Sequence, residues 1–178
     1  PVTHTDGLHH RMGDYVKSEL ATVMDRPTIT GNAVHHYQRL APNKRAIVFC
    51  VSLEHAAHVA EEFTQMGFPA QRIDGKMDRR VRRQLVRDFT AGRVTVLTSC
   101  DIVSEGFDLP AIEVAILLRP TESVALHLQQ LGRAFRPYPG KAYALILDHA
   151  GNTMRHGLPD EERHWSLDGK AARQAVTG

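Results

Sequence analysis

The chain has 178 residues, of which 42% are hydrophobic and 24% are charged. This length and composition predict one globular domain with short appendages, and they argue against a disordered, collagen-like or coiled-coil protein. Its 22 lysines and arginines against 20 aspartates and glutamates leave a net charge of +2, too small for an overall field that would attract a polyanion.

The cysteines and the apolar runs predict a cytoplasmic protein without a membrane partner. Cys50 and Cys100 are the two cysteines, and nothing approaches a C-x-x-C pair, as is typical of proteins in a reducing cytosol. The polar segment of residues 1–10 has no apolar signal-peptide core. No later run reaches the roughly 18 apolar residues that a membrane span requires.

Residues 1–44 are expected to form a helical lead-in or linker. Apolar residues recur at intervals of three and four in residues 14–25 and 30–40, which predicts two amphipathic helices separated by Pro27. At the other end, residues 151–178 are rich in glycine and charge, so we expect a partly irregular C-terminal extension.

Residues 45–150 alternate between apolar runs and segments of helical periodicity. The helical segments begin near Ser52, Asp78 and Ser123, which are predicted N-caps. Runs that are apolar throughout suit a sheet covered on both faces, so the fold class is α/β with a doubly wound, mostly parallel sheet. Ligands bind such sheets at the loops that follow the carboxyl ends of the strands, where we expect the function to lie. The predicted strands are residues 45–51, 70–74, 94–99, 112–118 and 142–148.

Two arginines form the most specific candidate for chemistry. Arg133 and Arg136 are three positions apart, so their guanidinium groups leave one face of a helical turn, and Gln129 lies one turn before Arg133. Such a pair can neutralise the charge that develops on a transferred phosphoryl group. The alternative is a solvated helix end whose arginines complement the helix dipole.

The spacing Q-x-x-G-R-x-x-R of residues 129–136 resembles motif VI of superfamily 2 helicases. Residues 98–110 (TSCDIVSEGFDLP) resemble motif V of that superfamily, and residues 47–52 (IVFCVS) resemble motif IV. With three motifs in order, residues 45–148 are similar to the second RecA-like lobe of DEAD/DEAH-type helicases of bacterial or phage type. The resemblance implies a RecA-like fold, which is that of the P-loop NTPases, without the P-loop.

The resemblance assigns roles to residues that match the motifs. Arg133 and Arg136 match arginines that approach the γ-phosphate of ATP, and Gln129 matches a glutamine that positions that end of the nucleotide. These three are the candidate catalytic residues. The candidates for holding the nucleotide are Gly106, Asp108 and Gly132, of which the aspartate would meet the ribose hydroxyls. The candidates for binding nucleic-acid phosphates are Ser52, Ser99, Cys100 and Gly75.

Two positions depart from the commoner helicase pattern. Cys100 stands where many relatives have threonine, so Ser99 is expected to take over any hydroxyl contact to phosphate. Gln130 replaces an arginine that often follows the first residue of motif VI, which removes one contact. Neither change touches the arginine pair.

Missing motifs predict that the chain alone is catalytically silent. No Gly-Lys pair has the G-x-x-x-x-G-K-[ST] spacing of a P-loop, and no D-E-x-D or D-E-x-H carboxylate pair occurs. The resemblance therefore implies that ATP and Mg²⁺ are held mainly by a first RecA-like lobe of the same parent protein. That lobe is one expected partner, and DNA, in preference to RNA, is the other.

Two alternatives stay open from the sequence. The first is a non-catalytic RecA-like module that binds nucleic acid or a partner protein, with the arginines as relics. The second concerns residues 78–87 (DRRVRRQLVR), which form either a face for a polyanion or a solvated helix face. The histidines show no metal-ligand spacing, so no metal site is expected in this chain.

Overall fold

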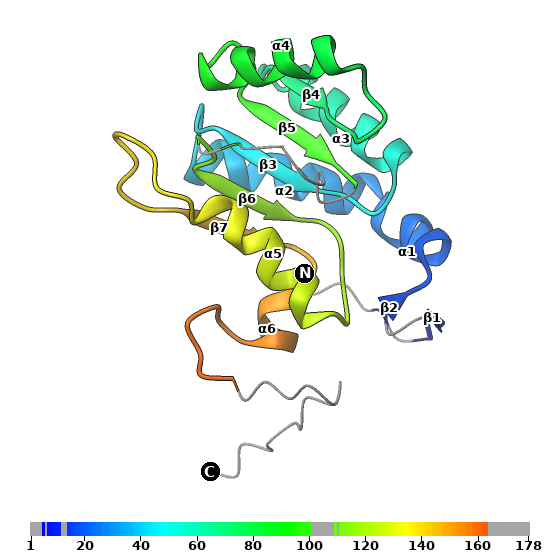
Figure 1. Ribbon diagram of the computed structural model, residues 1–178. Helices are drawn as coiled ribbons and strands as arrows, with labels where there is room; N and C mark the ends of the chain where they lie inside the picture. Colours follow the sequence, from blue (N-terminus) through cyan, green and yellow to red (C-terminus); the bar gives the residue numbers. More distant parts are fainter. Residues whose placement is uncertain (1–4, 6, 12–13, 101–108, 110, 164–178) are drawn as a thin grey trace.

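The computed structural model describes residues 5, 7–11, 14–100, 109 and 111–163. Five parallel strands form the main sheet, in the spatial order β4-β5-β3-β6-β7 (Figure 1). Each strand lies within one of the five runs predicted from the sequence, and each is shorter than its run. The strands are β3 Ala46–Phe49, β4 Ala70–Arg72, β5 Val96–Ser99, β6 Val114–Leu117 and β7 Leu145–Asp148.

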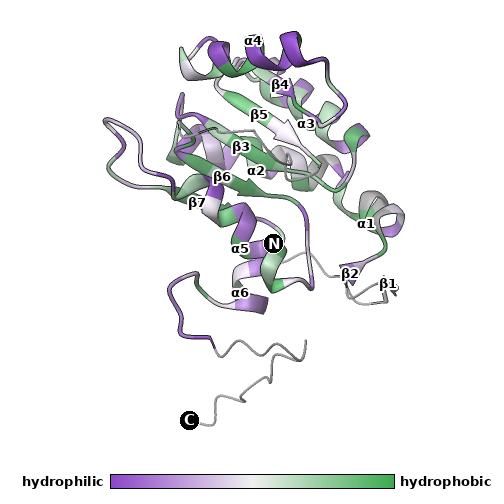
Figure 2. Cartoon of the chain, viewed as in Figure 1, coloured by the Kyte–Doolittle hydropathy of each residue, from purple (hydrophilic) through white to green (hydrophobic). Residues whose placement is uncertain are grey.

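Helices cover both faces of this sheet, and side chains of β3 alternate between them. Ile47 and Phe49 belong to the core beneath α4 and α5, whereas Ala46 and Val48 belong to the core beneath α2 and α3. The central strands are therefore apolar on both sides, and Figure 2 shows hydrophobic residues, in green, along β3 and β6. The expected doubly wound α/β fold is confirmed. The helices are α2 Pro27–Leu40, α3 Leu53–Gln65, α4 Arg79–Thr90 and α5 Val124–Ala134.

The segment before α2 differs from the sequence prediction. Strands β1 (His10–Arg11) and β2 (Asp14–Tyr15) pair as an antiparallel hairpin, and α1 starts only at Lys17–Met24. The prediction of a helix from residue 14 is therefore wrong at its start. Contacts with a distant loop hold the Asp14 carboxylate and the Tyr15 hydroxyl, and they override local helical periodicity.

Helix α2 begins at Pro27, three residues before the predicted start. Proline is favoured in a first helical turn because it has no N–H that would need a partner there. The ring of Tyr37 packs edge-to-face with the rings of Phe63 and Phe68, with centroid distances of 5.3 Å and 5.0 Å. Its hydroxyl donates to the carbonyl of Lys44 at 2.6 Å. The second half of the predicted lead-in thus shares the core of the sheet, and the division at residue 44 stays a prediction.

After β7 the chain turns into a short helix, α6 (Asn152–His156). Gly151 makes this turn with a φ of 71°, a left-handed conformation that glycine adopts without strain. Most of the predicted C-terminal extension, residues 164–178, lies outside the described residues. Within the part that the structure describes, no helix has the length and apolar character to cross a membrane.

Candidate functional site

The carboxyl ends of β3, β5 and β6 meet at one edge of the sheet. The N–H of Cys50 donates to the carbonyl of Ser99 at 2.7 Å, and the N–H of Leu118 donates to the carbonyl of Phe49 at 3.0 Å. Ser52 follows β3 and caps α3, where its hydroxyl accepts a hydrogen bond from the N–H of His55 at 3.0 Å. The hydroxyl proton of Ser52 remains available to donate to a ligand.

Ser99 ends β5 at the same edge and Cys100 follows it, and both side chains are covered. Ser99 is 1% exposed and Cys100 is 9% exposed. A phosphate that approaches here would meet the backbone of the edge before either side chain. The expectation that Ser99 supplies a hydroxyl contact therefore requires its side chain to become more exposed than it is in this conformation.

Gly75 lies in the exposed turn between β4 and α4. The Arg82 guanidinium donates to the carbonyls of Gly75 at 3.3 Å and Met77 at 2.9 Å, which braces this turn. A Cβ built on Gly75 would meet no atom within 4 Å, so a ligand has open access to its backbone. Asp78 then caps α4 by accepting from the N–H groups of Arg80 and Val81. The structure thus brings Gly75, Ser52 and the end of β5 to one edge.

The residues of the arginine motif lie on a different surface. Ser123 caps α5 at the carboxyl edge by accepting from the N–H of Leu126 at 3.2 Å, and α5 then runs back along the sheet (Figure 1). Arg133 is ten residues further on, about 15 Å along the helix axis. The motif therefore does not lie among the loops at the carboxyl edge, where the sequence led us to expect the function.

Four candidate residues share the second half of α5 and its end. Gln129 and Gly132 are exposed, whereas Arg133 and Arg136 are half-buried. Both arginines interact with other groups of the chain. Gln130, the position that departs from the helicase pattern, is 1% exposed, and its Oε1 has no hydrogen-bond partner among the described residues. It is a core residue rather than part of this surface.

Lys141 holds the end of α5, although no motif in the sequence includes it. Its ammonium donates to the carbonyl of Ala134 and, at 2.8 Å, to the carbonyl of Arg136. Burial lowers the pKa of Lys141. The signal in the sequence was a cation a few residues beyond a helix end, where carbonyl groups lack partners. Lys141 therefore fixes the backbone at Arg136.

Two candidate nucleotide-binding residues, Gly106 and Asp108, lie outside the described residues, as does most of the segment that resembles motif V. Among the residues that are described, no group of three or more His, Cys, Asp or Glu side chains could hold a metal ion. His58 is paired with Asp25 at 2.8 Å.

Both the sequence and the fold are similar to those of known proteins. Residues 31–138 match the profile of a family described as the helicase conserved C-terminal domain. The chain is 38% identical over 158 residues to a 51.5 kDa protein of a Lactococcus phage (isolate 7-9), and the match covers 89% of this chain and 34% of that protein. It is 35% identical over 112 residues to irc3 of Schizosaccharomyces pombe, named as a candidate mitochondrial ATP-dependent helicase, with coverages of 63% and 18%.

Among solved structures, the E. coli DEAD-box protein SrmB, bound to regulator of ribonuclease activity A, superposes with a TM-score of 0.61 at 21% identity. The superposition covers 84% of this chain and 91% of that one, and at this identity it supports the fold alone. The chain spans about a third or less of the length of the two curated relatives.

Proposed function

Because this chain belongs to the family of helicase conserved C-terminal domains, we propose that it is the second lobe of an ATP-dependent nucleic-acid helicase or translocase. The observation that carries the proposal is the pair of separate surfaces on one lobe. One surface is the carboxyl edge of the sheet with Ser52 and Gly75, and the other is the second half of α5 with Arg133 and Arg136. A helicase needs one site for the nucleic acid along which it moves and another site for ATP.

The arginine surface faces the nucleotide. ATP and Mg²⁺ would be held mainly by a first lobe of the parent protein, and the metal would supply positive charge beside the phosphates. Arg133 and Arg136 then place two cations on the γ-phosphoryl group as charge develops there, and Gln129 positions that end of the nucleotide. Gly132 leaves the helix surface open beside them, while Gly106 and Asp108 hold the ribose side.

The carboxyl edge binds the phosphate backbone of the nucleic acid. Ser52 donates its hydroxyl proton, and the open N–H groups at the start of α3 attract a phosphate. Gly75 and the end of β5, with Ser99 and Cys100, extend this surface along the edge. DNA is the proposed nucleic acid because the sequence of residues 104–110 (SEGFDLP) resembles the corresponding segment of bacterial and phage helicases.

The test is ATP hydrolysis by the full-length parent protein with and without single-stranded DNA. We expect Arg136→Ala to lower the stimulated rate by about 100-fold or more, in the range found when one group that stabilises transition-state charge is removed. Arg39→Ala is the matched control, because Arg39 is exposed at the end of α2 on the opposite face of the sheet. Activity of Arg136→Ala within about twofold of wild type would contradict the arginine assignment.

Two further measurements separate the alternatives. The chain of residues 1–178 by itself should hydrolyse no ATP, since its sequence has no P-loop. Comparing how strongly DNA and RNA of the same base sequence stimulate ATP hydrolysis decides between the two nucleic acids. A parent protein that binds nucleic acid without hydrolysing ATP would favour the non-catalytic module.

A further inference from the structure

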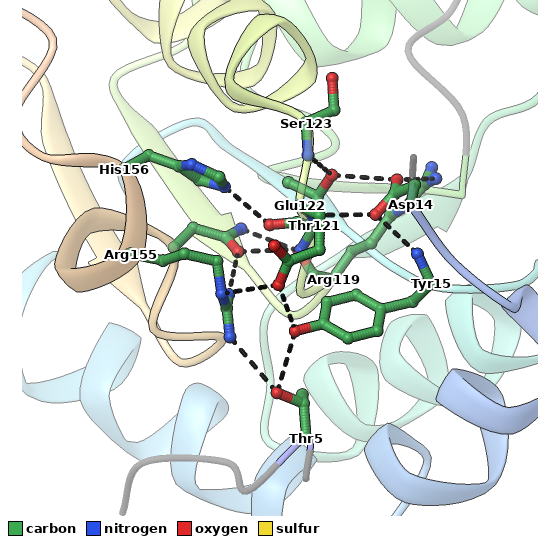
Figure 3. A network of polar contacts seen from close by, with 10 residues as sticks. Thr5, Asp14, Tyr15, Arg119, Thr121, Glu122, Ser123, Arg155 and His156 are labelled. Carbon is green, nitrogen blue, oxygen red and sulfur yellow. Dashed lines mark hydrogen bonds and ion pairs between the residues drawn. The ribbon is translucent and has the colours of Figure 1, made fainter. Parts of the chain in front are cut away.

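The loop between β6 and α5 is held from two sides by polar contacts (Figure 3). From α6, the amide of Asn152 accepts from the N–H of Thr121 at 3.0 Å and donates to the carbonyl of Arg119 at 2.8 Å. The Nε2 of His156 lies 2.7 Å from the carbonyl of Thr121. The loop is therefore fixed to the end of the lobe that follows β7.

From the N-terminal hairpin, Asp14 grips the same loop with both carboxylate oxygens. Oδ1 accepts from the N–H of Glu122 at 2.9 Å, and Oδ2 accepts from the hydroxyl of Thr121, also at 2.9 Å. The Thr121 hydroxyl in turn accepts from the N–H of Ser123 at 3.0 Å. Since Ser123 caps α5, the carboxylate of Asp14 is one hydroxyl group away from the start of the helix that carries the arginines.

Arg119 joins this carboxylate to the carboxyl edge of the sheet. Its Nη1 donates to the carbonyl of Cys100 at 3.3 Å, and its Nη2 lies 3.6 Å from Oδ2 of Asp14. The residue is 8% exposed, and its Nε has no hydrogen-bond partner among the described residues. Separating a largely buried cation from its paired carboxylate costs electrostatic free energy, so a displacement of Arg119 would pull on Asp14.

We propose that Arg119 is a positioning residue that couples nucleic-acid binding at the carboxyl edge to the arginines of α5, with Asp14 as its link to that helix. The proposal rests on the proposed function. Cys100 adjoins the end of β5, where the nucleic acid is proposed to bind. A backbone shift at Cys100 therefore moves the Arg119 guanidinium. Through Asp14 the shift reaches Thr121 and Glu122, and hence the first turn of α5. Closing of the edge on a phosphate backbone thus re-aims α5 toward the nucleotide.

The test compares basal and DNA-stimulated ATP hydrolysis by the full-length parent protein carrying Asp14→Asn, Arg119→Lys or both. Asparagine keeps the shape of Asp14 without its charge, and lysine keeps the charge of Arg119 without its two-pronged reach. We expect each variant to lower the stimulation ratio by about tenfold while the basal rate and the KM for ATP stay within about twofold. The double variant should lose no more than the more severe single variant, because both substitutions cut the same link.

A second readout follows from reciprocity. If DNA promotes hydrolysis through this link, a non-hydrolysable ATP analogue tightens the binding of a single-stranded DNA oligonucleotide through the same link. That tightening should shrink in Asp14→Asn and Arg119→Lys, whereas DNA affinity without the analogue should stay near the wild-type value. A residue that only supports the fold would weaken DNA binding in both conditions.

The matched control is Asp88→Asn, which removes the charge of another aspartate in an ion pair, 2.6 Å from Arg93 at the end of α4. It should leave the stimulation ratio unchanged. Should Asp14→Asn fail to fold, Thr121→Val tests the same link, because it removes the hydroxyl between Asp14 and Ser123 and leaves the charged pair in place.

The coupling proposal is overturned if basal and stimulated rates fall by the same factor, if neither changes, or if the two single variants are additive. Failure of the proposed function looks different. In that case Arg136→Ala leaves hydrolysis unchanged, whatever the variants of Asp14 and Arg119 do.

Discussion

The backbone N–H of Cys50 donates to the carbonyl of Ser99 at 2.7 Å, and this bond locks the ends of β3 and β5 together where Ser52 begins α3. Ser52 has two separable tasks at this edge. Its oxygen accepts from the N–H of His55, which stabilises the helix, and its proton is free for a phosphate.

Substitutions at Ser52 separate capping from phosphate binding. Ser52→Ala loses both functions, so we expect a stability loss of about 1 kcal/mol and weaker binding of single-stranded DNA. Ser52→Asp keeps the cap, because aspartate accepts from the same N–H groups, but it places a negative charge toward the phosphate. The aspartate variant should therefore be as stable as wild type in urea unfolding and bind DNA at least as weakly as the alanine variant. Wild-type affinity in Ser52→Asp would exclude a phosphate at this position.

The outer face of α4 carries exposed arginines. Arg80 and Arg83 are exposed, and neither forms an ion pair within the part of the chain that the structure describes. They follow the Gly75 turn by one and two helical turns, so they extend the carboxyl edge. Arg87 lies one turn further away and donates to the amide oxygen of Gln84 at 2.8 Å.

Salt dependence of DNA binding tests this face of α4. A substitution that removes one contact with a phosphate should lower the slope of log K against log salt by about 0.7 for single-stranded DNA. We expect Arg80→Ala and Arg83→Ala to lower the slope by this amount, and Arg87→Ala, the control on the same helix, to leave it unchanged. Equal slopes for all three variants and wild type would mean that α4 presents only a solvated face.

Much of the sheet was predictable because its strands are apolar on both faces. The run of residues 112–118, for example, contains β6 at Val114–Leu117, and an apolar run that is both short and continuous suits a strand buried on both sides. The hairpin at Asp14–Tyr15 was not predictable in the same way. Its stability comes from contacts with Thr121 and Glu122, more than one hundred residues away, and local periodicity carries no trace of them.

The candidate site also combines features that local sequence predicts with features that depend on the three-dimensional fold. The spacing of Arg133 and Arg136 predicts a shared helix face, but the distance of that face from the carboxyl edge depends on the direction in which α5 returns along the sheet. Arg119 acts through the backbone carbonyl of Cys100, 19 residues away, and such a contact leaves no spacing pattern in the sequence. Lys141 follows the end of α5 closely, and a cation in that position is a weak signal that belongs to no motif.

Acid should destabilise the lobe through His55. This side chain is fully buried in the first turn of α3, and burial lowers its pKa from the usual value of 6.5 to about 4. Between pH 6.5 and pH 4 the unfolded chain therefore binds more protons at this position than the folded chain, so the free energy of unfolding falls as the pH falls. The part of this loss that is due to His55 should be about 2 kcal/mol between pH 7.5 and pH 5, measured by urea unfolding as the difference between wild type and His55→Asn.

Two variants check the assignment to His55. His55→Asn cannot take up a proton, so its stability should fall less steeply between these pH values. His58 contributes with the opposite sign, because its hydrogen bond with Asp25 raises its pKa. Its stabilising effect is present at low pH and is lost as the pH rises through the folded pKa, so His58→Asn should steepen the loss in acid. The same pH dependence in wild type and His55→Asn would assign the acid sensitivity to other groups.

Lys141 should control how well Arg136 is aimed, even though the lysine itself does not reach a nucleotide in the proposed arrangement. Lys141→Met keeps the length of the side chain but leaves the carbonyls of Ala134 and Arg136 without their donor. We expect a stability loss of about 1 kcal/mol and a fall of about tenfold in the DNA-stimulated rate at saturating ATP, since a small displacement of a catalytic group is costly. Lys44→Met is the control, because the ammonium of Lys44 pairs with the carboxylate of Glu113 at 3.0 Å rather than with the end of α5. If Lys141→Met is less stable but hydrolyses ATP at the wild-type rate, the end of α5 does not need this lysine to present Arg136.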